Sequence, residues 1–144
     1  MPRLTVWFVR TALFYLATGF LIGAVLLVHR GFPLAPWVSV LLPLHVQFLL
    51  IGWMVQLTLG VAFWILPRFR SGPPRGREGF AWLAYGLLNG GVITSAFGHA
   101  AGLPSLVPLL GHTAVGLAGI TFGLHAWPRV KVFGASDQEG QHVT

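Results

Sequence analysis

The stretch LHVQFLLIGWMVQLTLGVAFWILPR, residues 44–68, decides the fold. It is apolar almost throughout, and it exceeds the length of about 20 residues that a helix needs to cross a bilayer. One histidine (His45), two glutamines and two glycines lie inside it. Because polar groups within a bilayer are costly, they mark function by default. The stretch therefore predicts a spanning helix that carries a functional histidine.

The composition of the whole chain agrees with a membrane protein. Of 144 residues, 55% are hydrophobic and 8% are charged, whereas soluble domains carry about 25% charged residues. The net charge of +6 does not lie on one basic face; the charges sit in loops and tails between apolar runs. This pattern indicates membrane topology and excludes a nucleic-acid partner.

Hydropathy predicts an all-α membrane protein, an antiparallel bundle of four transmembrane helices. Residues 1–131 would form the single membrane domain, and residues 132–144 a flexible cytoplasmic tail. The predicted spans are about 11–29, 38–66, 80–101 and 105–127.

The basic residues predict the orientation of the bundle. Eight of them fall on one side of the predicted spans and Arg30 falls alone on the other. The positive-inside rule then places both termini in the cytoplasm, with the protein in the cell inner (plasma) membrane. The eight are Arg3, Arg10, Arg68, Arg70, Arg75, Arg77, Arg129 and Lys131.

The two halves of the chain resemble each other weakly. The first half reads G-x5-H, loop, P-L-H and ends on LPR, while the second reads F-G-H, loop, P-L-L-G-H and ends on WPR. This echo is consistent with two repeated helical hairpins, although short helices produce such echoes by chance.

The absence of cysteine excludes thiolate metal sites, iron–sulfur ligation and covalent c-type haem. Histidine is the strongest metal ligand that remains. His29, His45, His99 and His112 all fall toward the outer side in the predicted topology. At a rise of 1.5 Å per residue their depths differ by about 9 Å. The four therefore share one layer, but the sequence does not decide which two meet.

We predict His45 and His112 as the axial ligands of a haem b, since they lie further inside their helices than His29 and His99. His99 is the first substitute and His29 the second. The latter two lie next to loops, where a histidine commonly hydrogen-bonds water or backbone. They are alternatively ligands of a second haem or of Cu or Zn.

Glycines continue the helix faces of His45 and His112. A flat macrocycle needs an axial nitrogen with no side chains beneath its face, so we expect these glycines to clear a haem face. The alternative is close helix packing through small residues. Arg30, the one outer cation, is predicted to pair with the haem propionates. The glycines are Gly52, Gly60, Gly116, Gly119 and Gly123.

The opening stretch also resembles the second helix of haem-copper oxidase subunit I, including its nitric oxide reductase branch. The matching residues are His45, Gly52-Trp53, Gly60 and Leu66-Pro67-Arg68. The resemblance covers about 25 residues and implies that His45 is an axial ligand of the low-spin haem. That family has about twelve spans and a copper centre on later helices, which this chain lacks. The resemblance therefore implies a haem-binding helix, not a complete oxidase or reductase.

Three functions remain open. The first is a small cytochrome that carries electrons between quinol and an outer-side protein, or a component of a respiratory complex. The second is a haem-based binder or sensor of NO, CO or O2 with an open axial site. The third is a Cu- or Zn-binding assembly factor without haem. A bundle this small is expected to form a homo-oligomer or to join a partner subunit. Its aromatic outer faces are expected to be either lipid belts or subunit contacts, and they include Trp7, Phe8, Trp64 and Trp82.

Overall fold

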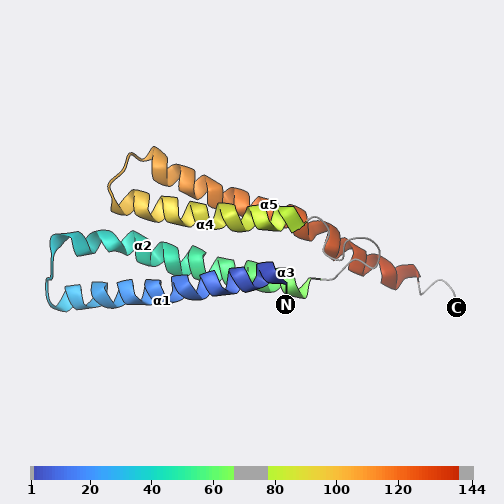
Figure 1. Cartoon of the computed structure of the whole chain (residues 1–144), viewed down its shortest axis with the longest axis horizontal. Helices are drawn as coiled ribbons and strands as arrows, with labels where there is room; N and C mark the ends of the chain where they lie inside the picture. The colour runs from blue at the N-terminus through green and yellow to red at the C-terminus, as the bar shows by residue number, and fades with distance from the viewer. Residues whose placement is uncertain (1, 67–77, 140–144) are drawn as a thin grey trace.

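The computed structural model describes residues 2–66 and 78–139, with side chains described as far as residue 130. Over these residues the protein is all-helical, with four helices long and apolar enough to cross a membrane. They are α1 (Arg3–Gly31), the second span (Pro36–Ile65), α4 (Glu78–Ala100) and α5 (Leu106–Glu139). Figure 1 shows them as two antiparallel hairpins packed into one bundle.

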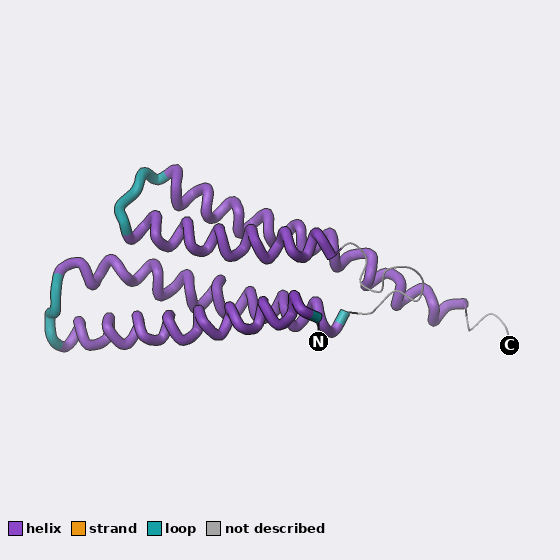
Figure 2. Tube along the Cα trace, in the orientation of Figure 1, coloured by secondary structure: helices purple, strands orange, loops and turns teal. Residues whose placement is uncertain are grey.

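We call α1 with the second span the first hairpin, and α4 with α5 the second hairpin. Their short connections, residues 32–35 and 101–105, lie at the same end of the bundle, which we call the loop end (Figure 2). The N-terminus lies at the opposite, terminal end (Figure 1). The four spans and the bundle confirm the predicted fold class.

Helix α5 is longer than its predicted span. It continues through Pro128 to Glu139, beyond residue 127 and into the segment predicted to be a flexible tail. The predicted loop cations between the second and third spans fall within residues 67–77, outside the described residues.

The second span changes its winding along its length. It begins as a 3-10 helix, η1 (Pro36–Leu41), continues as α2 (Leu42–Gln47), widens into the π-helix η2 (Phe48–Val55) and ends as α3 (Gln56–Ile65). In a π-helix each amide bonds to the carbonyl five residues earlier, so each turn holds more residues than an α-helical turn.

The wide turn keeps one face of this span buried. Five of its buried residues recur at every fourth position, a spacing that drifts by about 40° per step on a regular α-helix of 3.6 residues per turn. The π-helix reduces this drift, so that the row faces the bundle throughout. The row consists of Leu44, Phe48, Gly52, Gln56 and Gly60.

Large apolar side chains cover the outside of the bundle. Trp7, Phe14, Leu21 and Trp82 are all exposed, as expected for residues that face lipid rather than water. Phe8 was predicted to belong to this surface, and that prediction is wrong: Phe8 is fully buried, where its ring packs edge-on against Tyr85 of α4.

Candidate functional site

The predicted layer of histidines is present at the loop end. His29 ends α1, His45 lies in α2, His99 ends α4 and His112 lies near the start of α5. Because antiparallel helices bring the end of one beside the start of the next, each hairpin carries one such pair. The pairs line different cavities: His29 and His45 line one, and His99 and His112 line others.

His45 is inserted between the two helices of the first hairpin. Its Nδ1 lies 2.9 Å from the carbonyl oxygen of Gly19 on α1. Since a carbonyl only accepts, Nδ1 carries the proton and Nε2 keeps its lone pair. The ring lies over Gly23, where a methyl group would approach His45 Cε1 to 2.6 Å. Gly23 therefore provides the space for the imidazole, and Gly19 fixes its tautomer.

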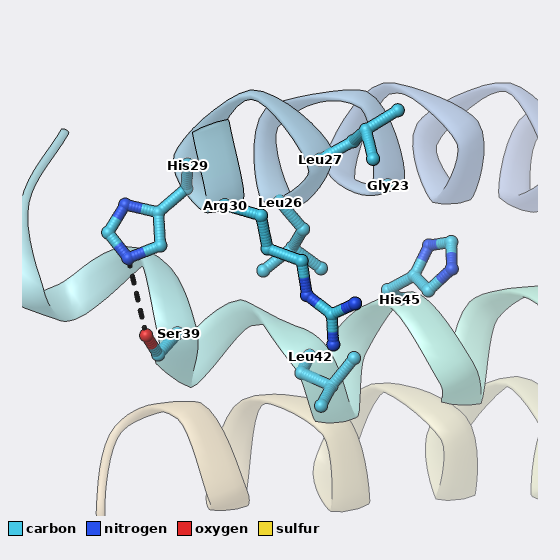
Figure 3. A pocket seen from close by; sticks show the side chains of 8 residues that line it. All are labelled: Gly23, Leu26, Leu27, His29, Arg30, Ser39, Leu42 and His45. Atoms are coloured by element: carbon cyan, nitrogen blue, oxygen red, sulfur yellow. Dashed lines mark hydrogen bonds between the residues drawn. The ribbon is translucent and has the colours of Figure 1, made fainter. Parts of the chain in front are cut away.

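A cavity of about 340 Å³ lies beside this ring. Its volume is at the lower end of the range for small-molecule sites. Figure 3 shows the Arg30 side chain extending into it, between His29 and His45, with Leu42 opposite. The cavity thus combines a half-buried imidazole, a cation and an apolar wall. Its lining is Gly23, Leu26, Leu27, His29, Arg30, Ser39, Leu42 and His45.

His29 uses both ring nitrogens for local structure. The backbone amide of Leu34 donates to Nδ1 at 3.1 Å, so Nδ1 carries no proton and Nε2 does. Nε2 donates to the hydroxyl of Ser39 at 3.5 Å (Figure 3). These contacts hold the turn between α1 and η1. They support the predicted alternative, a loop-end histidine bonded to backbone, over a ligand.

His99 and His112 are the pair of rings that the structure brings together. Their centroids lie 5.7 Å apart, with 57° between the ring planes. Nδ1 of His99 donates to the Ser95 carbonyl at 2.8 Å, which leaves Nε2 as an acceptor. The predicted axial pair was His45 with His112. In the structure His45 turns toward α1, while His112 turns toward His99, so the predicted pair does not share a cavity.

The glycines of the second span have a different role from the predicted one. A methyl group on Gly52 would lie 2.6 Å from Cγ of Tyr15, and one on Gly60 would lie 2.6 Å from Cβ of Phe8. The space beside both glycines is filled by aromatic side chains of α1. This corrects the prediction that they clear a haem face, and it supports the alternative of close packing.

The glycines of α5 remain open. A methyl group on Gly116, Gly119 or Gly123 would meet nothing within 4 Å, and all three are exposed. They form a strip without side chains that continues from His112 toward the terminal end, as the spacing predicts. The strip faces out of the bundle, however, and not toward the second span.

The structure contains a buried polar cluster at the terminal end that the sequence does not predict. Arg129, predicted as a loop cation, is 1% exposed and donates to the Leu66 carbonyl at 2.7 Å. Its guanidinium also lies 3.3 Å from Nε2 of His125 and over the ring of Phe63. The cluster links the last turn of the second span to α5. The matching LPR and WPR endings were the only signal of a relation between these two segments.

Within the described part of the chain, no group of three or more His, Cys, Asp or Glu side chains is arranged to hold a metal ion.

No protein-family model, curated protein or solved structure matches this chain. The similarity of residues 44–68 to a haem-copper oxidase helix thus stays a resemblance. Pro67 and Arg68, two of the residues that carry it, lie outside the described residues.

Proposed function

We propose that this multi-pass membrane protein binds haem b at the loop end of the first hairpin, with His45 as the axial ligand. The observation that carries the proposal is the 2.9 Å contact between His45 Nδ1 and the Gly19 carbonyl. In histidines that bind metals, the N–H of the second ring nitrogen commonly donates a hydrogen bond to a carbonyl, which fixes the ring and makes the other nitrogen a better metal ligand. His45 is arranged in this way inside a lipid-facing bundle.

The cavity beside His45 suits an amphipathic ligand with a carboxylate edge. Leu26, Leu27 and Leu42 give it an apolar wall, and Arg30 contributes a cation. A guanidinium forms strong, charge-assisted hydrogen bonds with carboxylates such as the haem propionates. At about 340 Å³, the cavity would enclose only part of a macrocycle.

The histidines around this cavity favour a single protein ligand. His29, the other imidazole in the lining, uses both of its nitrogens, and His112 lies beside His99. When bound, haem iron with one histidine supplies an open axial position for NO, CO or O2. We therefore favour a gas binder or sensor over an electron carrier. The six-coordinate cytochrome would require the second hairpin to turn His112 or His99 toward His45.

Absorption spectra of the detergent-purified protein test the proposal. Oxidised, dithionite-reduced and CO-treated samples would be compared for wild type, His45→Ala, His29→Ala and His112→Ala. We expect one haem per chain with a CO-shifted Soret band, lost in His45→Ala and retained in the other two variants. His45→Gly with added imidazole should recover the spectrum, which separates loss of the ligand from misfolding.

Two other results would change the assignment. One is sharp absorption bands of the reduced protein that do not change with CO and that disappear in both His45→Ala and His112→Ala. This result would establish the bis-histidine cytochrome, with quinol or an outer-side protein as redox partner. Wild-type protein that binds no haem, even when purified with haem supplied, would overturn haem binding altogether.

The orientation is part of the same proposal: both termini in the cytoplasm of the cell inner membrane, and the haem near the outer surface. The chain has no cysteine, so single cysteines report topology cleanly. Ser105→Cys, at the loop end, should react with a membrane-impermeant maleimide in intact cells, and Arg3→Cys should react only after lysis. The reverse pattern would invert the orientation.

A further inference from the structure

We propose that His99 and His112 form a second site, independent of the haem cavity, that binds one divalent transition-metal ion such as Cu²⁺ or Zn²⁺. The proposal begins from the two rings, whose centroids are 5.7 Å apart and inclined by 57°. Two imidazole nitrogens that each lie about 2.0–2.1 Å from one ion place their ring centroids about 5–6.5 Å apart, depending on the angle at the metal. The observed separation falls within this range.

The protonation state of His99 is suited to binding. Its Nδ1–H donates to the Ser95 carbonyl at 2.8 Å, so Nε2 presents a lone pair. This is the orienting contact that is typical of metal-bound histidines. His112 forms no hydrogen bond with the described residues, and both His99 and His112 are exposed. Their side chains also line a hollow shared with the second span. A metal ion therefore meets two accessible imidazoles.

Close packing between α4 and α5 fixes the helices that carry the rings. A methyl group on Gly111, adjacent to His112, would lie 2.5 Å from the Ser95 backbone nitrogen. One on Gly98, adjacent to His99, would lie 3.2 Å from Cδ of Pro108. Since the backbones touch, a macrocycle has no room between these helices. Both imidazoles project from the same side of the contact, which suits an ion and excludes a haem clamped between them.

The surroundings leave the remaining coordination positions to small ligands. The rings line two hollows, one of which includes Ser105 and the other Gln47 and Ser95. Because no third His, Cys, Asp or Glu joins them among the described residues, water would complete the coordination. Two imidazoles with open positions suit Cu²⁺ or Zn²⁺ and do not suit Mg²⁺ or Ca²⁺, which take oxygen ligands.

The test is Cu²⁺ binding to untagged, chelator-washed protein in detergent, measured by electron paramagnetic resonance. The expected spectrum has nitrogen hyperfine splitting from two imidazoles, at one Cu²⁺ per chain, and added Zn²⁺ should displace the signal. His99→Ala and His112→Ala should each weaken binding by at least about tenfold. His29→Ala is the matched control, since both its nitrogens are used, and it should bind as wild type.

His45→Ala separates this site from the proposed haem site. It should leave Cu²⁺ binding unchanged even when haem is lost. A Cu²⁺ signal that survives in the double variant His99→Ala/His112→Ala, or that disappears in His45→Ala, would overturn the proposal. Circular dichroism of each variant should match wild type, which shows that a lost signal reports the ligand and not unfolding.

Discussion

The two hairpins differ in what their interface glycines contact. In the first, each glycine at the interface faces a side chain of the neighbouring helix: Gly52 faces Tyr15, Gly60 faces Phe8 and Gly23 faces His45. In the second, glycine faces backbone, since a methyl group on Gly91 would lie 2.7 Å from the Gly111 carbonyl oxygen. Small residues allow helices to approach in lipid, where packing drives association.

This difference decides where the imidazoles go. Helices spaced by side chains leave room for a ring, so His45 lies inside the first hairpin with its Nδ1 on the Gly19 carbonyl. Helices in backbone contact leave none, so His99 and His112 lie side by side at the edge of the second. Similar sequence patterns thus produce a half-buried histidine in one hairpin and an exposed pair in the other.

The largest expected effect is on the backbone contact of the second hairpin. Gly111→Leu would drive a side chain into the α4 backbone, where even a methyl group meets Ser95 nitrogen at 2.5 Å. Such overpacking should lower the free energy of unfolding by about 3 kcal/mol, measured by denaturant titration in detergent micelles. In Gly116→Leu, on the same helix, the new side chain meets open space, so the variant should unfold as wild type. An equal loss of unfolding free energy in both variants would contradict the backbone contact at Gly111.

The next effect concerns the buried link between the hairpins at the terminal end. Arg129→Met removes the donor to the Leu66 carbonyl and leaves that oxygen without its charged partner. We expect a loss of about 2 kcal/mol in the free energy of unfolding, followed by the same titration. Arg10→Met, which removes a cation at an exposed position, is the control. A similar loss of unfolding free energy in this variant would show that the positive charge, and not the buried contact of Arg129, contributes the stability.

A single methyl group should disturb the histidine of the first hairpin. Gly23→Ala would place Cβ 2.6 Å from His45 Cε1 and push Nδ1 away from Gly19. Haem affinity should fall about tenfold, equivalent to about 1.4 kcal/mol, measured by haem titration. Gly86→Ala, in open space on α4, should bind haem as wild type. Unchanged affinity in Gly23→Ala would argue against His45 as the ligand.

The smallest expected effect is on the polar contact that joins the hairpins near the loop end. Gln47 donates to the Ser95 hydroxyl at 2.6 Å, and Gln47→Leu should cost about 1 kcal/mol of unfolding free energy. Thr58→Val, which removes a hydrogen bond within the second span, should cost less. If Thr58→Val costs as much, contacts between the hairpins contribute no more than local ones.

The sequence by itself determined the four helices, their alternating direction and the shared end of the four histidines. Long apolar runs must form helices in lipid, because only a helix satisfies all backbone hydrogen-bonding groups within a single segment. Short connections then make neighbours antiparallel. The observed helices begin and end near the predicted boundaries except at two ends: α1 begins at Arg3 and not near residue 11, and α5 extends to Glu139.

The tertiary structure alone decided which rings meet and which glycines stay open. Each residue turns an α-helix by about 100°, so an error of one position sends a side chain to another neighbour. The π-helix at Phe48–Val55 adds a shift that apolar periodicity does not predict. Gly52 and Gly116 look alike in sequence, yet Tyr15 covers the first and nothing covers the second, because only the second is on a helix face without a neighbour.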